Sequence, residues 1–212
     1  MAEFNPVSFT PFRKAVHMLT ARYFLTPIYF VRNRIKVSGR ENVPKDRPCL
    51  IVGNHLSHFD PPLLCIATDV PMAYVAKEEL FEVPILKHLI NFYGAIPINR
   101  AKTQKSTIKT VKKIFEAGWN VGMFVEGTRS KTPGTLGRPH LGAAYFAYTN
   151  KVPILPVGII DTHKSWKQAE ARIGKPFEPS KDLEQTTWEI MDRLSELTGY
   201  TVDRRLAESI EV

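Results

Sequence analysis

The segment Asn54-His55-Leu56-Ser57-His58-Phe59-Asp60 brings imidazole and carboxylate groups close together in sequence. In a helix, His55 and Asp60 would point to different faces, because each residue turns by about 100°. They can meet only across a turn, and a turn is expected here because Asp60 and the prolines after it are typical of a helix start. A carboxylate beside an imidazole fixes its tautomer and stabilises its cationic form. The pair predicts a general base that acts on a hydroxyl group near neutral pH.

The same segment allows other interpretations. His58 also lies near Asp60, so either histidine could be its partner. The His-x-x-His-x-Asp spacing is compatible with a metal site, but the sequence shows no further cluster of ligands, and no metal is predicted. A surface turn capped by an aspartate is the structural alternative.

A second polar cluster follows the apolar run Val121–Val125, which predicts a buried strand. Glu126, Gly127, Thr128 and Arg129 come directly after it. An arginine and free backbone N–H groups at such an opening would bind a phosphate group. A carboxylate that follows a buried strand needs a partner, so these residues are candidates for a binding site rather than for a solvated loop.

A third candidate, Arg100, ends the segment Gly94–Arg100, where a short strand would deliver it as a second phosphate ligand or as an ordinary surface arginine. Common nucleotide and nucleophile motifs are missing from the sequence: GxGxxG, GxxxxGK[ST] and GxSxG. Neither Cys49 nor Cys65 neighbours a histidine in sequence, so a covalent intermediate on the enzyme is not expected. Both cysteines lie in apolar stretches and are expected to be buried.

Strands alternating with helices must position these clusters. The pattern predicts strands at 34–37, 49–52, 72–76, 95–98, 121–125, 154–160 and 171–174, and helices from Asp60 and at 84–93, 103–117, 140–149 and 183–197. Pro97 restricts its strand to an edge or an ending. The alternation predicts an α/β fold with a mixed, largely parallel sheet covered by helices on both faces. Ligands in such sheets bind beyond the carboxyl ends of the strands.

The first 35 residues differ from the α/β domain expected at 36–212. Phe12, Val16, Leu19 and Tyr23 recur at helical spacing, with Arg13, Lys14 and His17 beside them, and Pro27 is expected to stop or kink this helix. An apolar stripe with a basic flank suits the headgroup layer of an anionic membrane, whereas packing of the stripe against the domain is the alternative.

Membrane contact is expected to be peripheral. The longest apolar candidate, 24–31, falls well short of the roughly 20 residues that a spanning helix needs. The N-terminal residues do not show the basic start and apolar core that are typical of a secretory signal. Two unpaired cysteines suit a reducing cytosol.

Composition limits the class of partner. The chain has 212 residues and a formal net charge of +8, with 43% hydrophobic and 24% charged residues, which is typical of a globular protein and excludes a disordered or fibrous chain. The charge suggests an anionic partner such as acidic lipid headgroups, a phosphorylated substrate or nucleic acid. No nucleic-acid motif and no basic and aromatic stripe is present, so nucleic acid is not expected.

Taken in order, the clusters resemble the glycerolipid acyltransferase family, in particular 1-acylglycerol-3-phosphate acyltransferases. Residues 54–60 are similar to its NHxSxxD block and residues 124–130 to its FPEGTRS block. Residues 94–100 and 152–157 are similar to its second and fourth blocks. Four blocks in the right order cover roughly residues 35–175.

The resemblance implies transfer of a fatty acyl group to the sn-2 hydroxyl of lysophosphatidate, giving phosphatidate, at the cytoplasmic face of a membrane. His55 would deprotonate the hydroxyl, and Asp60 would orient the His55 ring. Acyl carrier protein or coenzyme A would supply the thioester as co-substrate, with no other cofactor. The substrate-binding residues it implies are Lys77, Arg100, Glu126, Gly127, Thr128 and Arg129.

Two departures from the family pattern concern the phosphate side of the site. Val125 stands where the family usually has proline, and Asn99 stands where many members have aspartate. Glycerol 3-phosphate or another lysophospholipid is therefore an alternative acceptor, and a non-enzymatic basic membrane-binding module is the alternative of another class.

Overall fold

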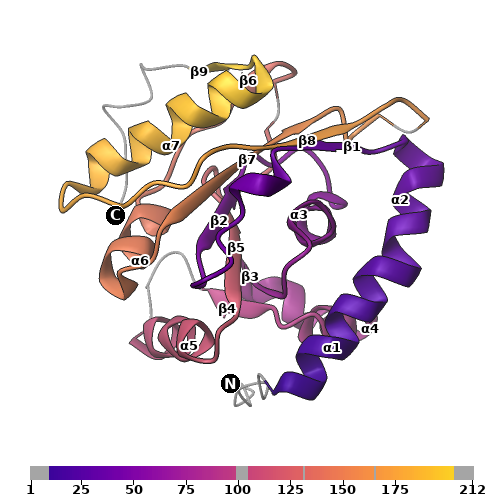
Figure 1. Cartoon of the computed structure of the whole chain (residues 1–212), viewed down its shortest axis with the longest axis horizontal. Coiled ribbons are helices and arrows are strands. Elements are labelled where there is room, and N and C mark those ends of the chain that lie inside the picture. The colour runs from indigo at the N-terminus through magenta and orange to yellow at the C-terminus, as the bar shows by residue number, and fades with distance from the viewer. Residues whose placement is uncertain (1–9, 99–104, 131, 165, 203–212) are drawn as a thin grey trace.

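A seven-stranded sheet forms the centre of the computed structural model, which describes residues 10–98, 105–130, 132–164 and 166–202 (Figure 1). The strands lie in the order β1-β8-β7-β2-β5-β3-β4. Their bounds are β1 Lys36–Ser38, β2 Leu50–Gly53, β3 Met72–Lys77, β4 Ile96–Ile98, β5 Asn120–Phe124, β7 Ile154–Ile160 and β8 Glu170–Ile173. All neighbours pair in parallel except β7 and β8, which are antiparallel. The expected mixed, largely parallel sheet is confirmed.

Helices cover both faces of this sheet (Figure 1). Their bounds are α1 Pro11–Thr20, α2 Thr26–Asn33, α3 Asp60–Thr68, α4 Pro84–Phe92, α5 Lys105–Glu116, α6 Gly142–Asn150 and α7 Leu183–Thr198, with short helical segments η1 Ala21–Leu25, η2 Arg40–Asn42 and η3 Glu78–Glu82. One core lies between the sheet and α5, α6 and α7, and the other lies against α3 and the N-terminal helices. Cys49 and Cys65 are both buried, as expected.

The middle of the sheet is buried on both faces. Strand β2 is enclosed along its whole length because β5 and β7 flank it and helices cover it above and below. Gly53, the last residue of β2, lies opposite Phe124 of β5 and Val157 of β7. Since the three strands are parallel, their carboxyl ends meet at one edge of the sheet, where the sequence places its polar clusters.

Element boundaries agree with the sequence to within one or two residues, with instructive exceptions. Arg34 was expected in a strand, but it takes a left-handed conformation (φ 47°) and ends α2. Helix α6 begins at Gly142 rather than at His140, because the His140 N–H donates to the carbonyl of Val125 at 3.0 Å. Pro97 lies in β4, which is an edge strand as its proline requires.

Pro27 was expected to stop or kink the N-terminal helix, and the structure shows that it does not stop it. Helical turns continue from α1 through the π-helical segment η1 into α2 (Figure 1). The Thr26 N–H donates to the Ala21 carbonyl five residues back, which widens the turn that precedes the proline. Pro27 then lies in the first turn of α2, where a missing N–H is tolerated.

The two sides of this long helix are the reverse of those of an ordinary surface helix. The basic flank faces the domain: Arg13 donates to the Asn91 carbonyl and Lys14 to the Gly118 carbonyl, both near the ends of helices that favour cations. His17, which the sequence places in the basic flank, is only 1% exposed. The apolar stripe points outward instead, with Phe12 79% and Tyr23 72% exposed.

The helical turns end at Asn33 and β1 begins at Lys36, while the division into segments 1–35 and 36–212 stays a prediction. Within the described residues, every helix is too short or too polar to cross a lipid bilayer.

A two-stranded ladder lies apart from the main sheet. Strand β6, Thr135–Leu136, pairs in parallel with β9, Thr201–Val202. The ladder holds the loop that follows the second polar cluster.

Candidate active site

The turn between β2 and α3 is fixed by its first residue. Asn54 is fully buried, and its amide group accepts from the Ile159 N–H at 2.7 Å and donates to the Ile159 carbonyl at 2.9 Å. This pair of hydrogen bonds continues the β2–β7 pairing by side chain after the backbone of β2 has turned away. His55 is therefore delivered to a defined place above the sheet edge.

The His55 ring and the Asp60 carboxylate meet across this turn, as the sequence predicts. His55 Nδ1 lies 2.9 Å from Asp60 Oδ2, with side-chain exposures of 17% and 0%. The same oxygen accepts the N–H groups of Leu56 and Ser57, each at 2.6 Å. The His55 ring stacks on Phe124 with a centroid separation of 4.1 Å. Nδ1 is thus held by the carboxylate, and Nε2 is the nitrogen left to meet a substrate.

The other oxygen of Asp60 has a partner from a distant part of the chain. Thr162 Oγ1 donates to Asp60 Oδ1 at 2.6 Å, and the Thr162 side chain is buried. The carboxylate therefore accepts from His55, Leu56, Ser57 and Thr162, and the imidazole at its side is that of His55 rather than of His58.

Glu126 ties two loops together beneath the site. One carboxylate oxygen accepts from the His55 N–H at 3.0 Å and the other accepts from the Gly137 N–H at 2.7 Å. The side chain is 2% exposed, and burial raises its pKa to about 7. Glu126 thus has the partners that the sequence required, and they are backbone groups of the site itself. Its proposed contact with substrate stays a prediction.

A cavity of about 390 Å³ opens in front of His55, within the range of small-molecule sites. Its wall includes His55, His58, Pro61, Val75, Ala76, Lys77, Leu80, Ile98, Met123, Phe124, Val125, Gly127, Thr128, Arg129, His140, Gly142 and Ala143. Five of these residues carry a basic side chain and none carries a carboxylate. One part of the wall suits an anionic group, and the apolar part suits a hydrocarbon chain.

The structure brings most of the predicted site residues to this cavity. His55, Lys77, Gly127, Thr128 and Arg129 line it. Gly127 adopts φ 62°, a left-handed conformation that the turn after β5 requires and that glycine accepts without strain.

Two of the remaining predicted site residues do not line the cavity. Asp60 and Glu126 lie behind it, in contact with His55. Arg100 lies outside the described residues.

Two residues of the site were not singled out from the sequence. Thr162 lies 102 residues from Asp60, so no local spacing could have paired them. His140 lines the cavity because it extends the strand-like path beside Val125 instead of starting α6. The sequence placed it only as the first residue of a helix, which gave no signal for a site.

This geometry can perform base catalysis on a bound hydroxyl group next to an anionic group. A metal site finds no support within the described ranges, where no three His, Cys, Asp or Glu side chains come together to hold an ion.

Comparisons with known proteins agree with this geometry. The family model named Acyltransferase matches residues 34–160, more than half of the chain. The chain belongs to the acyltransferase family. The matched region includes all the residues named above as lining the cavity. It also includes the named residues that contact the His55–Asp60 pair, except Thr162.

Several relatives of this acyltransferase carry the same name. It is 29% identical over 159 residues to a chloroplastic 1-acyl-sn-glycerol-3-phosphate acyltransferase of Arabidopsis thaliana, covering 74% of this chain and 44% of the relative. It is 29% identical over 187 residues to the 1-acyl-sn-glycerol-3-phosphate acyltransferase of Bacillus subtilis, covering 82% of this chain and 92% of the relative. The chain spans about half the length of the first curated relatives that it matches.

The fold is that of a solved acyltransferase. The crystal structure of the 1-acyl-sn-glycerophosphate acyltransferase from Thermotoga maritima superposes with a TM-score of 0.72 at 25% identity, covering 87% of this chain and 79% of that one. The likeness extends beyond the residues that the family model matches and confirms the expected fold class.

Proposed function

We propose that this acyltransferase transfers a fatty acyl group from a thioester, carried by acyl carrier protein or coenzyme A, to the sn-2 hydroxyl of lysophosphatidate, giving phosphatidate. The observation that carries the proposal is the meeting of the His55–Asp60 pair with a cavity whose charged and titratable lining is wholly basic. The names of the relatives support the same acceptor.

The cavity lining is suited to a phosphomonoester. Arg129 and Lys77 supply permanent positive charge, and the guanidinium can form two parallel hydrogen bonds with a phosphate group. No carboxylate of the lining opposes a dianionic ligand. Arg100 is proposed as a further phosphate ligand from the family resemblance alone.

The chemical step needs only groups that the chain and its substrates supply. His55 Nε2 takes the proton from the acceptor hydroxyl while the hydroxyl oxygen bonds to the thioester carbonyl carbon. The carbon–sulfur bond then breaks, and the leaving thiolate receives the proton from the imidazolium. Asp60 stabilises the imidazolium between these two transfers. No acyl group is attached to the enzyme at any point.

Attachment to an anionic membrane surface is part of the proposal, because both the acceptor and the product are lipids. Large apolar side chains of the N-terminal helices are exposed: Phe12, Leu19, Tyr23, Phe24, Ile28, Phe30 and Val31. A protein surface rarely leaves so many contiguous apolar groups without a partner. The cytoplasmic face of a membrane would cover these side chains, and the chain would not need to cross the bilayer.

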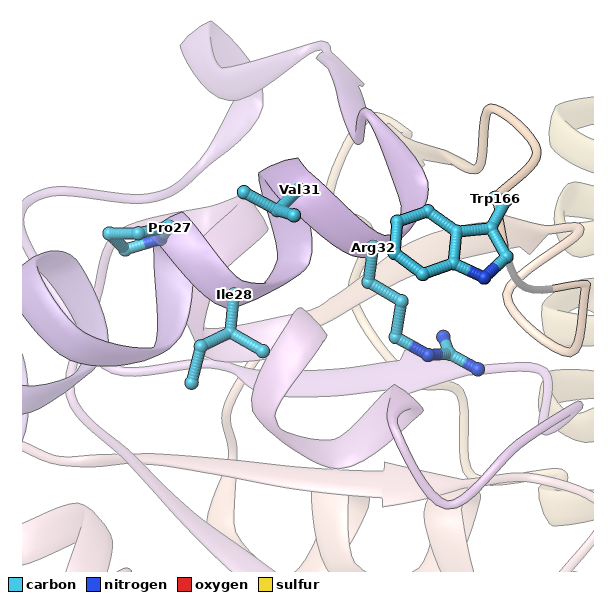
Figure 2. Close-up of a pocket in the computed structure, with 5 residues that line it drawn as sticks. All are labelled: Pro27, Ile28, Val31, Arg32 and Trp166. Atoms are coloured by element: carbon cyan, nitrogen blue, oxygen red, sulfur yellow. The ribbon is translucent and has the colours of Figure 1, made fainter.

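A tryptophan from the loop between β7 and β8 extends this apolar surface. Figure 2 shows the Trp166 indole beside Arg32 near the end of α2, with Val31 next to Arg32 in the chain and Ile28 about one turn earlier. Trp166 is 77% exposed and adopts φ 65°, a conformation that costs energy for a bulky residue. The backbone N–H of Trp166 donates to the Arg32 carbonyl at 2.9 Å, and this hydrogen bond holds the residue in place. An exposed indole beside a cation suits the interface of a bilayer.

An acceptor panel tests the reaction. Labelled acyl thioester is supplied with lysophosphatidate, glycerol 3-phosphate, a lysophospholipid with a choline headgroup, or monoacylglycerol, and the lipid product is identified. Transfer should be fastest to lysophosphatidate. Equal rates with monoacylglycerol would contradict the phosphate role of the cavity, and equal rates with glycerol 3-phosphate would favour that alternative acceptor.

Arg129→Ala tests the phosphate site directly. The apparent KM for lysophosphatidate should rise by about tenfold or more, because a charge-assisted hydrogen bond is lost, while the KM for the donor stays within about twofold. Arg47→Ala is the matched control, since Arg47 pairs with Glu178 on the surface and does not line the cavity. An effect of Arg129→Ala confined to the donor would remove the assigned role.

A further inference from the structure

The two carboxylate oxygens of Asp60 are held very unequally. Oδ2 is held by the His55 ring and by the N–H groups of Leu56 and Ser57, all within the same turn. Oδ1 is held by Thr162 Oγ1 at 2.6 Å. Thr162 and Asp60 are 1% and 0% exposed, so solvent does not replace this bond easily.

The direction and strength of this hydrogen bond follow from its partners. An ionised carboxylate only accepts, so the hydroxyl must donate. A separation of 2.6 Å is the length of a charge-assisted O–H···O⁻ bond, which is stronger than a neutral one. The last torsion of an aspartate side chain has a broad, roughly two-fold profile. The donors on Oδ2 alone restrict rotation of the carboxylate only in part. The hydroxyl that donates to Oδ1 therefore restricts this rotation further.

Thr162 itself is anchored independently of Asp60. It belongs to the β7–β8 loop, defined as residues 161–169 apart from 165, which lies outside the described residues. Arg32 donates to the Thr162 carbonyl at 3.3 Å. Two residues before the loop, Ile159 is clamped by the Asn54 side chain. Both anchors connect the loop to elements that also support the His55 turn.

From these contacts we propose that Thr162 is a positioning residue of the proposed acyl transfer. Its hydroxyl fixes the plane of the Asp60 carboxylate so that Oδ2 stays directed at His55 Nδ1. The proton of the neutral ring is thereby kept on Nδ1, and Nε2 keeps the lone pair that accepts the substrate proton. Thr162 acts through Asp60 and does not touch the substrate.

Thr162→Val removes the hydroxyl and keeps the shape of the side chain, whereas Thr162→Ser keeps the hydroxyl. Thr162→Val should lower kcat by about tenfold with the KM for acceptor within about twofold, because the bond to Asp60 serves the proton transfer and not binding. Thr162→Ser should retain kcat within about twofold. Thr162→Ala is a second variant without the hydroxyl, for use if valine fails to fold.

The matched control is Thr187→Val. Thr187 is fully buried and its hydroxyl donates to the Leu183 carbonyl within α7, at 2.7 Å, away from the cavity. It should lose some stability but keep kcat. A loss of kcat in this control equal to that of Thr162→Val would show that any buried threonine hydroxyl matters equally, and would overturn the proposal.

An Asp60→Asn background tests whether Thr162 acts through the carboxylate. There, Thr162→Val should lower the remaining rate by less than about twofold, since coupled residues are not additive. A full tenfold loss in that background would show that Thr162 acts independently of Asp60, which contradicts the proposal.

The tautomer of His55 gives a readout that does not depend on turnover. In ¹⁵N-histidine-labelled protein, with His55 signals assigned by His55→Gln, the neutral ring should carry its proton on Nδ1 in the wild type and in Thr162→Ser. Thr162→Val should show a mixture of tautomers. If the wild type transfers acyl groups while Thr162→Val keeps both its kcat and its tautomer, the positioning role is wrong and the function stands. If the wild type transfers nothing to any acceptor, the proposed function fails, and the tautomer comparison alone decides the role of Thr162.

Discussion

His55 has two ring nitrogens with different surroundings. Nδ1 is committed to Asp60, and the ring stacks on Phe124, which leaves Nε2 for the cavity. His58 lines the same cavity but is exposed, and within the described part of the chain its ring forms no ion pair with a carboxylate. The two histidines, three residues apart, should therefore differ sharply in their effect on rate.

His55→Ala should lower acyl transfer by at least about a hundredfold, as expected for loss of a general base. Binding to lipid vesicles should persist, because the exposed apolar side chains are on other elements. Steady-state rates with a labelled donor and vesicle sedimentation measure the two properties. The matched variant, His58→Ala, should stay within about fivefold of wild type. The reverse ranking of the two variants would reassign the base.

Glu126 should make stability depend on pH. Burial raises its pKa from the ordinary 4.5 to about 7, so between these values the folded protein holds this proton more tightly than the unfolded chain does. The stabilising contribution is fully present below pH 4.5 and is lost as pH rises to 7.

Glu126→Gln cannot titrate at this position. The free energy of unfolding of wild type minus that of the variant should therefore fall by on the order of 3 kcal/mol between pH 4.5 and 7. Urea unfolding across this range measures it. A difference that stays constant with pH would show that the pKa of Glu126 is the same in the folded and unfolded states.

At the scale of elements, the helical turns from α1 to α2 show how far a sequence pattern reaches. Helical spacing correctly identified the stripe of Phe12, Leu19 and Tyr23, but periodicity cannot tell which face of a helix meets the domain. That choice is made by Asn91 and Gly118, whose carbonyls lie near helix ends and accept from the basic flank.

His17 is the residue that the reversal of faces affects most. It lies between the rings of Tyr93 and Trp119, and its Nε2 lies 3.3 Å from Cys65 Sγ. Desolvation first, and the charge of Arg13 second, lower its pKa to about 4. α1 is thus attached to the domain through a neutral histidine.

Acidification should loosen this attachment. The contribution of neutral His17 to stability is fully present above its ordinary pKa of 6.5 and is lost as pH falls to about 4. In His17→Leu the titration is gone, so the free energy of unfolding of wild type minus variant should rise by on the order of 3 kcal/mol from pH 4 to 6.5. Urea titrations at several pH values measure it, and a slope of the opposite sign would mean that the folded state stabilises the imidazolium.

The fold was predictable from sequence where the signals are local. Alternating apolar runs and helix starts located the sheet strands, and the spacing from His55 to Asp60 identified a pair that does meet. The hydrogen bond from Thr162 and the link from Glu126 to Gly137 were not predictable, because register between distant segments decides them. The course of the helix past Pro27 was also missed, since a single widened turn accommodates the ring.

At the scale of the whole molecule, α2, which carries part of the exposed apolar surface, is in direct contact with the turn that bears His55 and Asp60. The Tyr29 hydroxyl in α2 donates a hydrogen bond to the Phe59 carbonyl at 2.5 Å. The Arg32 guanidinium lies 3.9 Å from the centroid of the Phe59 ring. Phe59 stands between His58, which lines the cavity, and Asp60. The helices with the exposed apolar side chains are therefore linked to the His55 turn through Phe59.

Replacing Phe12, Leu19 and Tyr23 together by serine should weaken binding to vesicles of anionic phospholipid by at least about a hundredfold, because three large apolar groups would no longer be buried in lipid. All three are exposed, so the thermal unfolding midpoint should change little. Tyr148→Ser, at a 41% exposed aromatic in α6, is the matched control and should bind normally. Unimpaired binding of the triple variant would place the membrane contact elsewhere.

The pairing of β1 with β8 sets an order of events during synthesis. Lys36 of β1 lies opposite Glu170 of β8, so the first strand waits for more than a hundred further residues before its neighbour exists. At typical translation rates of about 5–20 residues per second this delay lasts several seconds or longer. The outward apolar helix leaves the ribosome early, whereas Thr162 arrives late. The helices with the exposed apolar side chains are consequently synthesised well before the threonine that completes the hydrogen bonds of the Asp60 carboxylate.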